Sequence, residues 1–131
     1  MSSSTPEPSR TRVTGEAVRR EVLGDRHVDA AFANADAFTG DFQELLTTYA
    51  WGEIWGRPGL DRRVRSVITL SILATLRAET ELAMHVRAGL RNGLTPDEIK
   101  EVLLQVAIYA GVPAANTAFA VAQRVLREDA T

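Results

Sequence analysis

The stretch TPDEIKEVLLQVAIYAG, residues 95–111, contains the clearest helix signal in this chain and decides its fold class. Thr95 is a good N-cap residue, Pro96 suits the first helical position, and Glu98 stands three residues after the cap, which together make a capping box. Apolar residues then recur at helical spacing almost to the end of the stretch. The sequence therefore predicts a helix that begins directly after Thr95.

The second half of this helix is apolar on nearly every side, because Leu104, Ala107 and Ile108 add to the stripe that would face a core. A chain of 131 residues has difficulty covering such a helix by itself. We therefore expect a homo-oligomer, in which a second protomer buries the extra face.

The other segments also have helix-type boundaries, and no alternating β-branched runs suggest strands. Asp25, Thr39 and Asp61 are suitable N-caps. The helix that follows Asp61 is predicted to bury a stripe made by Val64, Val67, Ile68, Ser71, Ile72 and Leu76. We expect an all-α fold of about six to seven helices, with further helices over residues 14–23, 25–35, 39–55, 61–76, 79–92 and 114–128.

Composition limits the possible classes of protein. The length suits one domain, residues 13–131, after a Ser/Pro-rich tail, residues 1–12, that is expected to be disordered or loosely docked. A net charge of −2 gives no field for nucleic acid, and no stretch is apolar enough to span a membrane. The absence of cysteine excludes thiol chemistry, and two histidines are too few for most metal sites. We expect a cytoplasmic protein.

His85 is the first candidate for chemistry. It stands four residues after Glu81, so both side chains project from one helical stripe, and an imidazole is the commonest general acid or base near neutral pH. The alternative is a packed histidine that pairs with Glu81.

Arg62 and Arg65 share one face of the helix that follows Asp61 and could bind an anion. Ser66 and Thr69 continue this face, and these polar groups on an apolar helix suggest a cavity. The alternative is a charged first turn that lies in water. Cations at a helix start oppose the macrodipole, which favours a functional reason for them.

Two further groups combine aromatic and polar residues. Glu53 lies between Trp51 and Trp55, where a carboxylate embedded among rings would need a partner. Packing is the better interpretation for the aromatics, although Trp51 is also a candidate for substrate binding. The second group is a polar line on the helix after Thr95, formed by Glu101, Gln105 and Tyr109.

Together, several blocks of this sequence resemble the γ-carboxymuconolactone decarboxylase family, and the likeness covers nearly everything after the tail. The blocks are YAWGEIW (49–55), RPGLDRR (57–63), HVR (85–87), NG (92–93), DEIKEVLLQ (97–105) and IYAGVPAAN (108–116). The resemblance implies the alkylhydroperoxidase-D-like helical fold in a ring-like homo-oligomer, typically a hexamer. Peroxidase members of that superfamily carry glutamate, two cysteines and histidine where this chain has Ser66, Ala78, Glu81 and His85, so peroxide reduction is chemically excluded here.

The resemblance implies decarboxylation of γ-carboxymuconolactone to β-ketoadipate enol-lactone in protocatechuate catabolism, with no metal and no cofactor. Its partner would be a small dicarboxylate lactone. We hypothesise that Arg62 and Arg65 bind its carboxylate or enolate oxygens and that His85 delivers the proton. Glu53 and Glu81 would assist His85 in catalysis, while Tyr109 and Trp51 would contact the substrate.

Two other interpretations remain open at this point. One is a helical oligomer without catalytic activity that binds a small organic acid. The other is an enzyme of the same fold that acts on another lactone or keto acid.

Overall fold

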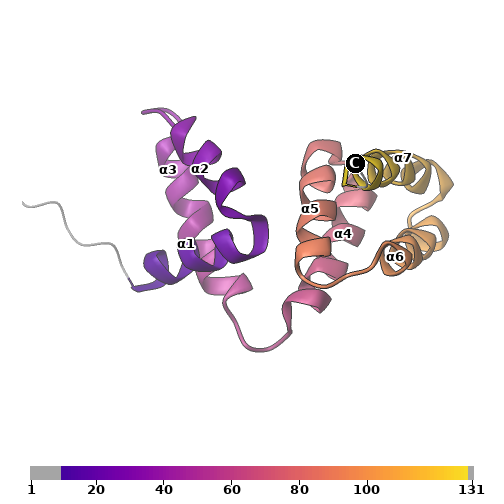
Figure 1. Ribbon diagram of the computed structural model, residues 1–131, viewed down its shortest axis with the longest axis horizontal. Helices are drawn as coiled ribbons and strands as arrows, with labels where there is room; N and C mark the ends of the chain where they lie inside the picture. The colour runs from indigo at the N-terminus through magenta and orange to yellow at the C-terminus, as the bar shows by residue number, and fades with distance from the viewer. Residues whose placement is uncertain (1–9, 130–131) are drawn as a thin grey trace, which may run out of the picture. The chain divides into compact units, whose positions relative to one another are not determined.

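The computed structural model describes residues 10–129, and within them every regular element is a helix, which confirms the all-α prediction. The chain divides into two compact units, one ending at Gly59 and one beginning at Leu60 (Figure 1). The first unit contains α1 (Arg10–Leu23), α2 (Asp25–Ala33), α3 (Gly40–Leu45) and the π-helix η1 (Leu46–Trp55). The second contains α4 (Arg62–Leu76), α5 (Glu79–Arg91), α6 (Pro96–Tyr109) and α7 (Val112–Asp129). The predicted extent of the domain, residues 13–131, stays a prediction.

In the first unit, α1 packs directly on η1. Two glycines permit this approach: a Cβ at Gly15 would lie 1.9 Å from the carbonyl oxygen of Thr47, and one at Gly52 would lie 2.5 Å from that of Thr11. Both positions therefore require glycine for steric reasons. The α1 helix starts at Arg10, four residues before the predicted start at Thr14; residues 1–9 of the predicted tail lie outside the described residues.

The four helices of the second unit enclose a hydrophobic core. Leu70 of α4, Leu82 and Val86 of α5, and Leu103 of α6 are almost completely buried there, together with Val125 of α7. Burial of aliphatic side chains of this size contributes about 1.5–3 kcal/mol each, which is the main force holding these helices together.

Two of the four predicted caps are confirmed with their hydrogen bonds. Asp61 accepts a bond from the backbone N–H of Val64, and Thr95 and Glu98 form the reciprocal capping box of α6. The expected cap at Asp25 is wrong, because α2 begins at Asp25 itself and Gly24 is its N-cap. Thr39 occupies the N-cap position of α3 as predicted, but its hydroxyl makes no cap bond. That hydroxyl instead accepts from the backbone N–H of Asp36 in the preceding turn.

The predicted helix over residues 39–55 contains a change of register. Its first turns form α3, and the following ten residues form η1, with the wider i→i+5 hydrogen bonding of a π-helix. Such long π-helices are rare, and π turns occur frequently at functional sites.

The stripe predicted to be buried on α4 is wrong in part. Ser66, Leu70 and Ala74 face the core instead. Four members of the predicted stripe, at i, i+4 spacing, are exposed on the opposite side: Val64, Ile68, Ile72 and Leu76. Both faces of α4 are apolar, and the face with the smaller side chains is the one that packs within the protomer.

The apolar second half of α6 behaves as the sequence suggests, since Leu104 and Ile108 are exposed in the protomer. Within residues 10–129, none of the helices combines the length and apolar composition that a bilayer span requires.

Candidate functional site

The first turn of α4 brings three arginines together after the Asp61 cap. Arg62 and Arg65 are half-buried, whereas Arg63 is exposed. Arg63 forms an ion pair with Glu98 and donates a hydrogen bond to the carbonyl of Gly93. This pairing connects the start of α4 to the loop before α6 and to the first turn of α6. Arg62 and Arg65 thus belong to a turn that is fixed at both the cap and the Arg63 side chain.

Electrostatics reinforce this connection. The Arg63 guanidinium, followed by the capping bond from the Thr95 backbone, lowers the pKa of Glu98 to about 2. Glu98 therefore serves two purposes, because one carboxylate both completes the capping box and neutralises Arg63. The sequence predicted the first role only.

His85 lies on α5 and is buried, with 7 % of its surface exposed, while Glu81 one turn earlier is exposed. The interpretation of His85 as part of a helix is confirmed. Glu81 and His85 occupy the same helix one turn apart, as their spacing predicted, but only the imidazole is enclosed by the protein.

A hydrogen bond between α4 and α5 defines how these two helices are aligned. Nδ2 of Asn92 donates to Oγ of the buried Ser66, at 2.9 Å. About one turn further along the pair, Gly89 of α5 lies beside Leu70 of α4, because a Cβ added at Gly89 would be 3.6 Å from the Leu70 side chain. His85 lies seven residues before Asn92, which is about 10 Å along the axis of α5. Ser66 and its neighbour Arg65 are therefore level with Asn92, and His85 is nearer the middle of the pair.

The cavity inferred from Ser66 and Thr69 is not required by these residues. Ser66 is buried and bonded to Asn92, and the Thr69 hydroxyl donates to the backbone carbonyl of Arg65 at 2.8 Å. Both polar groups are thus satisfied within the protein. Asn92 was not among the predicted site residues, although an asparagine before the glycine that ends a helix was a visible signal.

The first unit holds the remaining predicted catalytic residue on η1. Trp51 is buried and stacks on Trp55, with ring centroids 5.1 Å apart and planes inclined by 30°. Glu53 is exposed, so the expectation that it is embedded among the rings is wrong. Glu53 is therefore accessible to solvent, whereas Trp51 is not.

A groove of about 420 Å³ runs between α4 and α6. Tyr109 and Gln105 of the predicted polar line contribute to it, together with the hydroxyl residues Ser71 and Thr75 of α4. Tyr109 is 82 % exposed, so this groove is an open surface of the protomer. The groove contains Tyr109 but none of the predicted arginines and not His85.

A second groove, of about 400 Å³, lies between α6 and α7 and is lined mainly by apolar side chains. None of the predicted site residues lines it. The site candidates of the second unit therefore concentrate on the α4–α5 pair and on the α4–α6 groove. Within residues 10–129, no group of three or more histidine, aspartate or glutamate side chains is arranged to hold a metal ion.

The sequence of this chain is similar to that of a known protein family and of several of its members. Residues 40–124 match the carboxymuconolactone decarboxylase family, a span that includes η1, α4, α5 and α6. The chain is 46 % identical over 114 residues to a 4-carboxymuconolactone decarboxylase of Acinetobacter baylyi, covering 87 % of this chain and 85 % of that protein.

Two other relatives carry decarboxylase names. A nitrosuccinic acid decarboxylase of Metarhizium robertsii is 43 % identical over 114 residues, which are 87 % of this chain and 80 % of that protein. A 4-carboxymuconolactone decarboxylase of Pseudomonas putida is 49 % identical over 39 residues, which are 30 % of this chain and 81 % of that sequence. The match to the family model and these identities confirm the resemblance inferred from the sequence blocks. The chain belongs to the carboxymuconolactone decarboxylase family.

Proposed function

We propose that this protein decarboxylates 4-carboxymuconolactone, the compound also called γ-carboxymuconolactone, to β-ketoadipate enol-lactone in protocatechuate catabolism. The observation that carries the proposal is the 46 % identity, over most of both chains, to a relative named for this activity. Decarboxylation of this dianion needs cationic groups that bind it and a group that donates a proton. The second unit offers arginines on α4 and a buried imidazole on the adjoining α5.

The reaction needs no thiol and no electron acceptor. The bond between the ring and one carboxylate breaks, carbon dioxide leaves, and the electron pair delocalises through the ring double bond into the lactone carbonyl. A proton then adds to the carbon beside that carbonyl. Protein groups must hold the dianion, stabilise the dienolate oxygen and supply the proton.

We assign these tasks to the groups of the α4–α5 pair. Arg62 and Arg65 bind the carboxylate or enolate oxygens, and His85 delivers the proton. The arginines and His85 lie at different levels along the pair, so they address different parts of the substrate. Glu81, one turn from His85, orients or tunes the imidazole.

The other predicted residues take supporting roles. For Glu53 and Trp51 of η1, the resemblance to the family supports a catalytic role and a substrate-binding role, respectively. Tyr109 contacts the substrate from the α4–α6 groove, which its side chain lines.

We also propose that the protein forms a homo-oligomer, and the resemblance to the family makes a hexamer the expected form. Support comes from exposed apolar side chains on the two helices that form the groove containing Tyr109. On α4 they form an exposed stripe of Val64, Ile68, Ile72 and Leu76, and on α6 they are Leu104 and Ile108. A second protomer on this face would remove apolar surface from water and enclose the groove. Tyr109 would then line a covered cavity.

Nitrosuccinic acid is the second candidate substrate, because the relative named for its decarboxylation is 43 % identical over the same length.

Incubation of the purified protein with 4-carboxymuconolactone tests the proposal, with carbon dioxide and enol-lactone as products. Both products should appear in equal amounts. Binding without turnover would instead indicate a non-catalytic binder of organic acids.

A further inference from the structure

Arg19 of α1 is a buried cation with 4 % of its surface exposed. Its Nη1 donates to Oε1 of Gln43 at 3.0 Å and to Oγ1 of Thr47 at 3.3 Å, and both acceptors are neutral. Within residues 10–129 its Nε has no hydrogen-bond partner. Burial, and then the charges of Arg12 and Arg20, lower its pKa. A buried guanidinium in such surroundings costs free energy, so its retention needs a specific reason.

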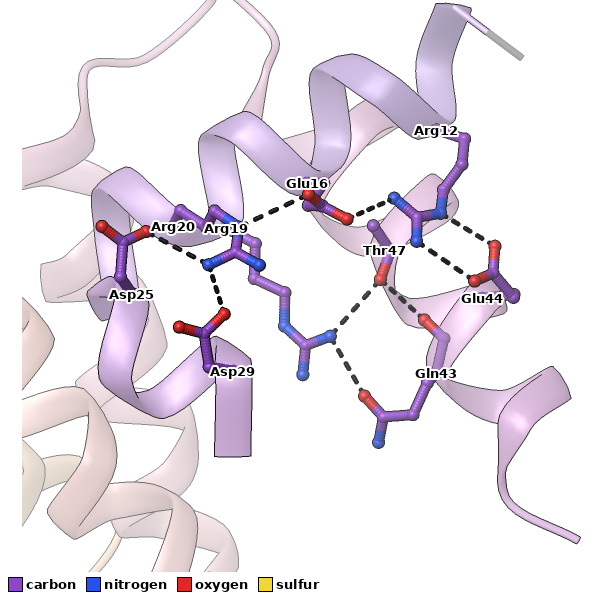
Figure 2. A network of polar contacts seen from close by, with 9 residues as sticks. All are labelled: Arg12, Glu16, Arg19, Arg20, Asp25, Asp29, Gln43, Glu44 and Thr47. Atoms are coloured by element: carbon purple, nitrogen blue, oxygen red, sulfur yellow. Dashed lines mark hydrogen bonds and ion pairs between the residues drawn. The ribbon is translucent and has the colours of Figure 1, made fainter. Parts of the chain in front are cut away.

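The neighbouring arginines show the contrast (Figure 2). Arg12 forms ion pairs with Glu16 and Glu44, and Arg20 forms ion pairs with Glu16, Asp25 and Asp29. Arg19 is directed away from these carboxylates, toward Gln43 and Thr47. The ring of Phe32, 5.4 Å from the guanidinium carbon, offsets part of the cost of its burial.

The two partners of Arg19 lie at the junction between α3 and η1. Gln43 belongs to the last turn of α3, and Thr47 is the second residue of η1. The Thr47 hydroxyl also donates to the backbone carbonyl of Gln43 at 2.7 Å. Arg19 therefore fixes a side-chain bridge across the place where i→i+4 bonding changes to i→i+5 bonding.

Close backbone packing fixes the position of α1, which carries Arg19, relative to η1. Gly15, one turn before Arg19, brings the backbone of α1 against the carbonyl of Thr47, and Gly52 makes a second close crossing. Because both crossings involve backbone atoms, α1 cannot slide along η1 without a clash. The guanidinium is thus held at a constant position relative to the junction.

The residues that follow the junction are the site candidates of η1. Trp51 lies four residues after Thr47 and stacks on Trp55, and Glu53 lies between the two tryptophans in the sequence. A return to α-helical register after Thr47 would rotate all three side chains about the helix axis. The register at the junction therefore determines where the carboxylate and the rings lie.

We propose that Arg19 is a positioning residue that holds η1 in its wide-turn register through Thr47. It thereby sets the directions of Trp51 and Glu53. The inference rests on the proposed function only for the catalytic use of these two residues, because the register is a structural property.

Arg19→Gln and Thr47→Val test the inference in the full-length protein. Each should alter the near-ultraviolet circular dichroism of the stacked tryptophans. Each should also lower kcat for 4-carboxymuconolactone about 10- to 100-fold with a smaller change in KM, as expected for misplacement of a catalytic group. The double variant should have a kcat little lower than that of Arg19→Gln alone, because both substitutions remove the hydrogen bond between Arg19 and Thr47. Thr47→Ser, which keeps the hydroxyl, should retain the wild-type circular dichroism of the tryptophans and the wild-type kcat.

Arg20→Gln is the matched control, since Arg20 is the next residue of α1 but pairs with surface carboxylates. It should leave the tryptophan signal and kcat unchanged. Folded Arg19→Gln with a wild-type tryptophan signal would overturn the register claim, and an altered signal with unchanged kcat would overturn the catalytic consequence. If Arg19→Gln does not fold, Thr47→Val decides by the same criteria. If the wild-type protein does not turn over the lactone, the proposed function fails, and the tryptophan signal still decides the register claim.

Discussion

Asn92 near the end of α5 donates a 2.9 Å hydrogen bond to Ser66 of α4, which is buried and directly follows Arg65. A neutral polar pair thus anchors the segment of α4 that carries the proposed anion-binding arginines. The position of these arginines depends on a side chain from another helix.

Replacement of Asn92 by alanine should therefore affect both stability and substrate binding. It leaves the Ser66 hydroxyl buried without this partner, and the free energy of unfolding should fall by about 1–3 kcal/mol. The KM for the lactone should rise as the first turns of α4 loosen. Urea denaturation and steady-state kinetics measure the two effects. Asn116→Ala, on an exposed position of α7, is the control and should change neither quantity by a comparable amount.

His85→Ala should lower kcat about 10²- to 10⁴-fold, the usual contribution of a positioned general acid. The same substitution at the only other histidine, His27, provides a matched control because His27 is exposed on α2. His27→Ala should retain wild-type kinetics. Undiminished decarboxylation by a folded His85→Ala protein would remove His85 from the mechanism.

The Arg63–Glu98 pair should make stability depend on pH in acid. The pKa of Glu98 is lowered from 4.5 to about 2 in the folded protein, first by Arg63 and then by the Thr95 backbone. Its contribution is therefore fully present above the unfolded pKa and is lost as the pH falls from about 4.5 to 2. Both side chains are partly exposed, so added salt should weaken the effect.

Urea midpoints measured across this pH range isolate the contribution of Glu98. Glu98→Gln keeps a capping acceptor but removes the charge, so its midpoint should decrease less steeply than that of the wild type. Asp97→Asn, at the adjacent exposed position, should follow the wild-type curve. A Glu98→Gln protein with the wild-type slope would show that Arg63 does not stabilise the carboxylate.

A charge in the exposed stripe of α4 should disrupt the proposed oligomer. Ile72 is 52 % exposed in the protomer, and burial of a glutamate there against a second protomer would be strongly unfavourable. Ile72→Glu should reduce the mass measured by sedimentation, whereas Arg124→Glu, on the exposed surface of α7, should not. An unchanged mass for Ile72→Glu would exclude this stripe as the interface.

Local chemistry explains which parts of the fold could be predicted. The caps at Asp61 and Thr95 depend on residues close in sequence, and both were predicted correctly. Part of the buried stripe of α4 was predicted on the wrong face, because Ile68 and Ile72 are large apolar residues, whereas the buried residues Ser66 and Ala74 are small. Periodicity does not say which of two apolar faces meets the protomer's own core.

The candidate site was less predictable, because it depends on contacts between distant residues. The roles of Arg19, 28 residues from Thr47, and of Asn92, 26 residues from Ser66, have no local pattern. The π-helical register of η1 likewise has no local pattern that predicted it, and η1 packs against the distant segment α1. The roles of the predicted site residues, the oligomer and the cytoplasmic location stay predictions.

The ratio of kcat/KM for 4-carboxymuconolactone to that for nitrosuccinic acid is the most direct test of the proposed activity. Both compounds should be assayed with one preparation of wild-type protein by carbon dioxide release. The account predicts turnover of the lactone with a ratio well above one. A ratio below one, or no carbon dioxide from the lactone, would contradict it.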